Sequence, residues 1–189
     1  MQTSRPALFL DRDGCVIEEV DYLSRLEDLQ LIPAVAEALK KAQQAGYLLI
    51  LVTNQSGVAK GKFTEDFVHQ AHERLQEMIK EAGGAMLDGI YYCPHRKDGQ
   101  APYNIDCDCR KPKRGMLDQA AADYKIDWEQ SYMIGDKICD VAMGFAAGMT
   151  GVLVRTGHGE QEIAGVLEAY PHTPVYEDLA AAIEEIIKA

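Results

Sequence analysis

Two aspartates separated by one residue, Asp11 and Asp13, follow a short apolar run at residues 7–10 and precede Gly14. A strand-like backbone places both carboxylates on the same side, and the glycine lets the chain turn sharply away. Carboxylates this close repel each other unless a cation lies between them, and Mg²⁺ prefers oxygen ligands and accompanies phosphates. The pair therefore predicts a magnesium site that handles a phosphate ester, with a surface turn as the alternative for so short a motif.

A polar segment follows the next apolar run, residues 47–52. A hydroxyl, side-chain amides and loop N–H groups at a strand end can hold phosphate oxygens. The alternative is an ordinary polar loop. The candidate phosphate-binding residues in this segment are Thr53, Asn54, Gln55 and Ser56.

Two later segments add a cation and more carboxylates. Lys111, within the basic segment 110–112, can neutralise charge on a transferring phosphoryl group, although basic pairs are usually solvated. Asp136 follows an apolar run and can complete a magnesium site with the first two aspartates. Asp140, one helical turn later, is expected to support that site as an outer partner. An acidic helix N-terminus is the alternative for these two residues.

Three of the five cysteines cluster with a histidine in one polar segment. Three thiolates and one imidazole form a closed tetrahedral zinc site with no position left for water, so we expect a structural zinc ion. Bound zinc would order the loop at residues 93–109 and position the basic segment that follows it. The alternative is four unrelated loop residues. The predicted zinc ligands are Cys93, His95, Cys107 and Cys109.

The composition limits the classes of partner. The chain has 189 residues and a net charge of −11, so its surface repels nucleic-acid backbones, and a phosphorylated substrate needs local positive charge. We find neither an apolar run of membrane-spanning length nor a signal-peptide core. We therefore expect a cytoplasmic protein without nucleic-acid or membrane partners. The odd cysteine count argues against a disulfide framework.

Near-continuous apolar runs alternate with helical patterns, which indicates an α/β fold with a parallel sheet covered by helices on both faces. Ligands of such sheets bind beyond the carboxyl ends of the strands, where the polar residues above fall. We expect one domain spanning residues 1–189, with the zinc loop inserted after the third strand. Strands are predicted at 7–10, 47–52, 87–92, 132–134 and 151–154, and helices at 32–45, 64–81, 115–124, 137–147 and 177–188.

These elements, in this order, resemble the haloacid dehalogenase-like phosphohydrolase superfamily over nearly the whole chain. The resemblance implies a Rossmann-like fold and two-step catalysis, in which Asp11 attacks phosphorus to form an aspartyl-phosphate. Asp13 would protonate the leaving oxygen and then activate water, and Mg²⁺ would offset the developing charge. The four family motifs are carried by Asp11 with Asp13, Thr53, Lys111, and Asp136 with Asp140.

Longer stretches, at residues 9–14, 52–61, 91–95 and 107–112, resemble the heptose bisphosphate phosphatases within that superfamily. This resemblance implies a monomer without a separate cap domain. It also implies removal of the 7-phosphate from a heptose 1,7-bisphosphate, for nucleotide-activated heptose that enters lipopolysaccharide core or surface glycans. Arg110 is the candidate for the remote phosphate. The implied substrate contacts are Glu19, Val20, Asp21, Tyr22, Thr53, Asn54, Gln55, Ser56, Arg110, Lys111 and Lys137.

Other interpretations stay open at this point. A histidinol-phosphate phosphatase shares the superfamily and a similar zinc loop, and a non-catalytic zinc-stabilised binding module is the alternative outside the enzymes. The net charge opposes a polynucleotide 3′-phosphatase. His69 and His72 are expected on an exposed helix face, and His158 follows the last predicted strand, where it can reach the rim of the pocket. Cys15 and Cys139 are expected to be small packed residues.

Overall fold

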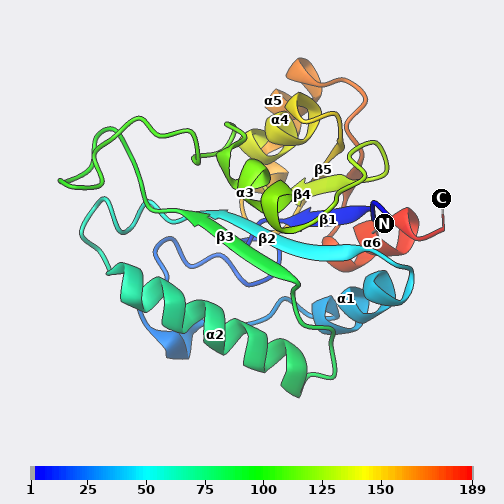
Figure 1. The fold of residues 1–189 in the computed structure, drawn as a ribbon, viewed down its shortest axis with the longest axis horizontal. Helices are drawn as coiled ribbons and strands as arrows, with labels where there is room; N and C mark the ends of the chain where they lie inside the picture. The colour runs from blue at the N-terminus through cyan, green and yellow to red at the C-terminus, as the bar shows by residue number, and fades with distance from the viewer. Residues whose placement is uncertain (1–2, 189) are drawn as a thin grey trace.

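The computed structural model describes residues 3–188 and contains one parallel sheet with helices on both faces (Figure 1). The strand order within the described residues is β3-β2-β1-β4-β5-β6, so the order along the chain reverses beside β1. This is a Rossmann-like arrangement, and the predicted fold class is confirmed. The strands are β1 (Ala7–Leu10), β2 (Leu48–Asn54), β3 (Gly89–Cys93), β4 (Tyr132–Gly135), β5 (Thr150–Val154) and β6 (Val175–Tyr176).

Helices α1, α2 and α6 cover one face of the sheet, and α3, α4 and α5 cover the other (Figure 1). Within residues 3–188, none of these helices has the length and apolar character needed to cross a bilayer. Their bounds are α1 (Val35–Gln44), α2 (Glu65–Glu81), α3 (Gly115–Asp123), α4 (Ile138–Ala146), α5 (Gly159–Ala169) and α6 (Leu179–Ile186), with a short 3₁₀ helix, η1 (Leu26–Asp28), before α1.

Strand β1 is apolar throughout because both of its faces are buried. Leu8 and Leu10 point into the core beneath α1, α2 and α6, whereas Ala7 and Phe9 point into the core beneath α3 and α4. All four side chains have no exposed surface. This two-sided burial is why a short continuous apolar run, rather than an alternating one, identifies each inner strand.

The observed helix ends follow local capping chemistry. The Thr64 hydroxyl accepts a hydrogen bond from the Phe67 N–H at 3.2 Å and begins α2 where predicted. Helix α1 begins at Val35 rather than at residue 32, because Ala34 has a left-handed backbone with φ of 64°. Neither α5 nor β6 was predicted. Their apolar signal is weak, since α5 buries only Gly159 and Val166.

Two helical glycines allow a direct test of the packing between α4 and the sheet. A Cβ at Gly144 would lie 3.0 Å from Gly151 Cα in β5 and 3.0 Å from Met133 Cβ, and neither atom can rotate away. Nothing lies within 4 Å of a Cβ at Gly165 in α5. We expect Gly144→Ala to destabilise the fold by about 1–3 kcal/mol.

The matched variant Gly165→Ala should stabilise the fold by about 0.5–1 kcal/mol, because alanine loses less backbone entropy on folding. Urea unfolding of both variants measures the contrast. Equal effects of the two substitutions would contradict this account of the α4 interface.

Candidate active site

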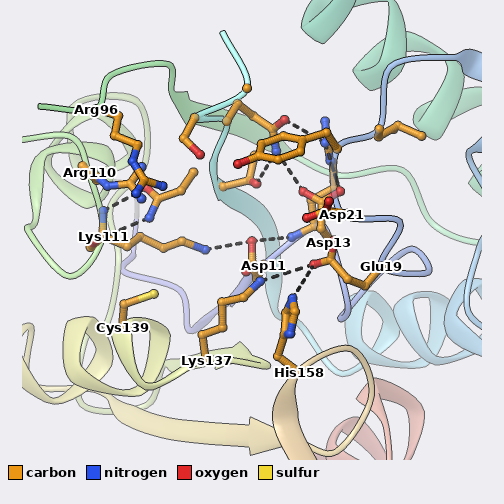
Figure 2. Close-up of a pocket in the computed structure, with 18 of the residues that line it drawn as sticks. Asp11, Asp13, Glu19, Asp21, Arg96, Arg110, Lys111, Lys137, Cys139 and His158 are labelled. Atoms are coloured by element: carbon orange, nitrogen blue, oxygen red, sulfur yellow. Dashed lines mark hydrogen bonds and ion pairs between the residues drawn. The ribbon is translucent and has the colours of Figure 1, made fainter. Parts of the chain in front are cut away.

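The candidate active site lies where the carboxyl ends of β1, β2 and β4 meet (Figure 2). Asp11 follows β1, Thr53 lies in β2 and Asp136 follows β4, so sheet topology brings three distant segments together. A cavity of about 250 Å³ opens at this edge. Its lining contains the charged and polar residues Asp11, Arg12, Asp13, Glu19, Asp21, Tyr22, Thr53, Asn54, Gln55, Ser56, Arg96, Arg110, Lys111, Lys137 and His158.

Lys111 is buried between two carboxylates. Its Nζ lies 2.8 Å from Asp11 Oδ1 and 2.7 Å from Asp140 Oδ1, and it donates to the Val52 carbonyl at 2.9 Å. Burial lowers the pKa of Lys111, but the charges of Asp11 and Asp140 outweigh burial and hold the pKa above its ordinary value. The side chain therefore brings a fixed positive charge to the inner wall of the cavity.

The acidic residues around Lys111 leave room for a further cation. Carboxylate oxygens of Asp11, Asp136 and Asp140 lie within 4.8 Å of one another. Asp136 is fully buried, and its Oδ1 accepts no hydrogen bond, although Lys137 Nζ lies 3.5 Å from it. Burial, with repulsion from Asp11, raises the pKa of Asp136 to about 6 and that of Asp140 to about 7. A crowded, all-oxygen donor set with a buried oxygen that accepts no hydrogen bond fits Mg²⁺.

Asp13 has a different environment from Asp11. Arg12 donates to Asp13 Oδ1 from Nη2 at 3.0 Å and from Nε at 3.2 Å, while Gln55 Nε2 donates to Asp13 Oδ2 at 2.9 Å. Burial raises the pKa of Asp13, but the Arg12 charge and these hydrogen bonds prevail and lower it. The carboxylate of Asp13 is thus held by Arg12 and Gln55, and the three converging acidic side chains are those of Asp11, Asp136 and Asp140.

Most of the expected substrate contacts line the cavity, whereas Val20 does not and is 38% exposed. Glu19 Oε2 lies 3.3 Å from Lys137 Nζ and 3.5 Å from His158 Nε2, which places His158 at the rim as expected (Figure 2). Arg96 also lines the cavity, although the sequence analysis did not select it. Its position directly after the predicted zinc ligand His95 was the available signal.

His72 is buried, and the expectation that it lies on an exposed helix face is wrong. Only 7% of its surface is exposed, and its Nε2 lies 3.4 Å from Arg12 Nη1. His69 on the same helix is exposed, as expected. The spacing along α2 contained the signal, since His72 falls on the stripe of buried residues Val68, Ala71, Leu75 and Ile79.

The four predicted zinc ligands converge after β3. Cys109 Sγ lies 3.1 Å from the sulfurs of Cys93 and Cys107, and His95 Nδ1 lies 3.3 Å from Cys109 Sγ. This closed Cys₃His donor set fits a structural zinc ion. The cluster is tied to the site by the next two residues, because Arg110 Nη1 donates to the His95 carbonyl and the Lys111 N–H donates to Asn54 Oδ1.

Comparison with known proteins agrees with this geometry. The HAD-hydrolase-like family model matches residues 108–182. A D-glycero-D-manno-heptose-1,7-bisphosphate 7-phosphatase of Thermosynechococcus vestitus is 46% identical over 96% of this chain and 95% of its own. The Haemophilus ducreyi D-glycero-beta-D-manno-heptose-1,7-bisphosphate 7-phosphatase is 51% identical over 81% of this chain and 85% of its own length.

A crystal structure of D,D-heptose 1,7-bisphosphate phosphatase from B. bronchiseptica, complexed with magnesium and phosphate, aligns with a TM-score of 0.85 and 32% identity. The alignment covers 97% of this chain and 98% of that one. Fold, site and relatives define a phosphoric monoester hydrolase of the haloacid dehalogenase-like class. Within that class, the chain belongs to the family of the D-glycero-D-manno-heptose-1,7-bisphosphate 7-phosphatases.

Loss of zinc is expected to loosen the segment that positions Lys111. We expect metal analysis to find one zinc per chain, and Cys107→Ser to lose it together with amide-exchange protection across residues 93–114. Cys15→Ala is the control, since Cys15 is buried outside the cluster and should leave zinc content unchanged. A metal-free wild-type protein with a fully protected loop would refute the zinc site.

His72 predicts a specific loss of stability in acid. Burial and the Arg12 charge lower the pKa of His72 to about 3, from 6.5 in the unfolded chain. The unfolded state therefore binds the proton first, so stability present above pH 6.5 is lost as pH falls toward 3. Between pH 7.5 and 5.5, wild type should lose about 1.4 kcal/mol more than His72→Gln. Urea unfolding at both pH values measures this difference, and parallel pH profiles would contradict it.

Proposed function

We propose that this chain is a magnesium-dependent phosphatase that removes the 7-phosphate of D-glycero-D-manno-heptose 1,7-bisphosphate. The observation that carries the proposal is the pairing of Asp11 with the buried ammonium of Lys111, beside the Asp136 oxygen that accepts no hydrogen bond. This arrangement offers a nucleophile, a charge that neutralises the phosphoryl group, and a cation site within one cavity. The names of the relatives support the choice of sugar.

Asp11 is the proposed nucleophile, and its carboxylate attacks phosphorus to form an aspartyl-phosphate. Lys111 stabilises the charge on the phosphoryl oxygens, and the Thr53 hydroxyl with the following loop holds them. Asp13 in its protonated form gives its proton to the leaving sugar oxygen, and the resulting carboxylate accepts a proton from the water that hydrolyses the intermediate. Its hydrogen bonds to Arg12 and Gln55 hold the carboxylate at the cavity wall for both steps.

Asp11 and Asp136 would hold the magnesium ion together with Asp13, while Asp140 supports the site through Lys111. Bound magnesium supplies charge neutralisation for the phosphoryl group and orients it toward the nucleophile. The side chain of Asp136 is kept in place by the His158 N–H, which donates to Asp136 Oδ2 at 2.8 Å. Its other oxygen, Oδ1, accepts no hydrogen bond and would be available as a metal ligand.

The second phosphate of the substrate needs positive charge, and the zinc loop supplies it. Residues 93–114 contain six Lys or Arg and three Asp, although the whole chain has a net charge of −11. Arg96 and Arg110 both line the cavity and are drawn at the same end of it in Figure 2. We assign the remote phosphate to Arg110, and the sugar hydroxyls to the loop of Glu19, Asp21 and Tyr22.

The experiment that tests this function is a kcat/KM panel with Mg²⁺. We expect kcat/KM to be higher for heptose 1,7-bisphosphate than for histidinol phosphate, which lacks the second phosphate. We expect Asp11→Asn to abolish turnover of both substrates while preserving the fold and the zinc content. Both anomers of the bisphosphate belong in the panel. A preference for histidinol phosphate would overturn the sugar assignment, and Mg²⁺-dependent turnover by Asp11→Asn would overturn the nucleophile.

A further inference from the structure

The guanidinium of Arg12 is buried, with 2% of the residue exposed, and each of its nitrogens has an acceptor. Nε and Nη2 bind Asp13 Oδ1, and Nη2 also donates to Gln55 Oε1 at 2.8 Å. Nη1 points the other way, toward His72 Nε2 at 3.4 Å. Arg12 thus connects the proposed acid–base residue to a histidine on α2 that the function above does not use.

The chemistry of arginine fixes the form of His72. A guanidinium only donates hydrogen bonds, so His72 Nε2 must carry a lone pair and the ring proton must sit on Nδ1. Burial of the ring beside a cation keeps the imidazole neutral. A neutral acceptor at this point leaves the Arg12 charge free to act on Asp13, because no second carboxylate competes for it.

Both partners of this contact are held in place. Tyr92 in β3 packs edge-on against the His72 ring, with 5.7 Å between ring centroids. The Tyr92 hydroxyl is in turn hydrogen-bonded to Glu65 Oε2 at the first turn of α2. Residues from β3 and α2 therefore fix the His72 ring, and His72 fixes one edge of the Arg12 guanidinium.

We propose that His72 is a positioning residue of the phosphatase site, which holds Arg12 so that Arg12 and Gln55 orient the carboxylate of Asp13. This inference rests on the proposed function, because it assigns His72 a role in the proton transfers of Asp13. Without an acceptor at residue 72, Arg12 Nη1 is buried without a partner. The guanidinium then shifts to find one, and the geometry of Asp13 shifts with it.

The test compares His72→Leu, which removes the acceptor, with His72→Gln, whose amide oxygen can restore it. The control is His172→Leu, the same substitution at an exposed position between α5 and β6 that does not line the cavity. For each variant, kcat and KM are measured, and the rate of the first turnover is measured on two esters. One ester is heptose 1,7-bisphosphate, whose sugar alkoxide needs a proton in order to leave. The other is p-nitrophenyl phosphate, whose phenolate leaves without one.

We expect His72→Leu to slow the first turnover of the sugar phosphate about tenfold or more, with KM unchanged and the aryl ester affected about threefold at most. His72→Gln should recover most of the rate, and His172→Leu should match wild type. Equal losses on both esters, or no recovery with glutamine, would overturn the positioning role. Wild type that hydrolyses neither ester would instead refute the proposed function.

A measurement on the wild-type protein does not depend on whether the variants fold. Nitrogen NMR of labelled histidine distinguishes the two neutral tautomers, and we expect His72 to carry its proton on Nδ1. A proton on Nε2 is incompatible with a hydrogen bond from Arg12 and would overturn the inference even in a fully active enzyme.

Discussion

The arrangement of the site depends on one buried ammonium group. Lys111 contacts Asp11 after β1, the Val52 carbonyl in β2 and Asp140 in α4, so it ties together three segments distant in sequence. A lysine with almost no exposed surface is stable as a cation only beside such partners. Because the Cys₃His cluster immediately precedes the basic segment 110–112, the loop that holds the cluster also brings this charge to Asp11.

Asp11 and Asp13 show how two carboxylates two residues apart acquire different environments. Asp11 faces Lys111 and the acidic residues at the end of β4, where a phosphoryl group and a metal ion would meet. Asp13 faces a guanidinium and an amide that leave the orientation of its carboxylate little freedom. Arg12 lies between them and contacts both: its backbone N–H donates to Asp11 Oδ1, whereas its side chain turns inward and, of the two carboxylates, binds Asp13.

Much of the fold could be predicted from the sequence because the inner strands are buried on both faces and read as continuous apolar runs. Helix α5 could not, since it buries few side chains. The Cys and His spacing identified a cluster that the structure brings together, although the roles of the site residues stay predictions. The partners of Arg12 could not be foreseen, because the local pattern Asp-Arg-Asp specifies residue types, whereas Gln55 and His72 reach Arg12 only through tertiary packing.

The balance of carboxylates and cations around Asp11 favours the binding of a divalent metal ion. The ion pairs around Asp11 join five carboxylates to three cations, namely Asp11, Asp13, Glu19, Asp136 and Asp140 to Arg12, Lys111 and Lys137. Burial, with repulsion from Asp11, raises the pKa values of Asp136 and Asp140. The excess of two carboxylates over cations equals the charge of one divalent cation. Such an ion would lower the repulsion that a phosphate dianion meets beside Asp11, while Arg96 and Arg110 bring positive charge to another part of the cavity lining.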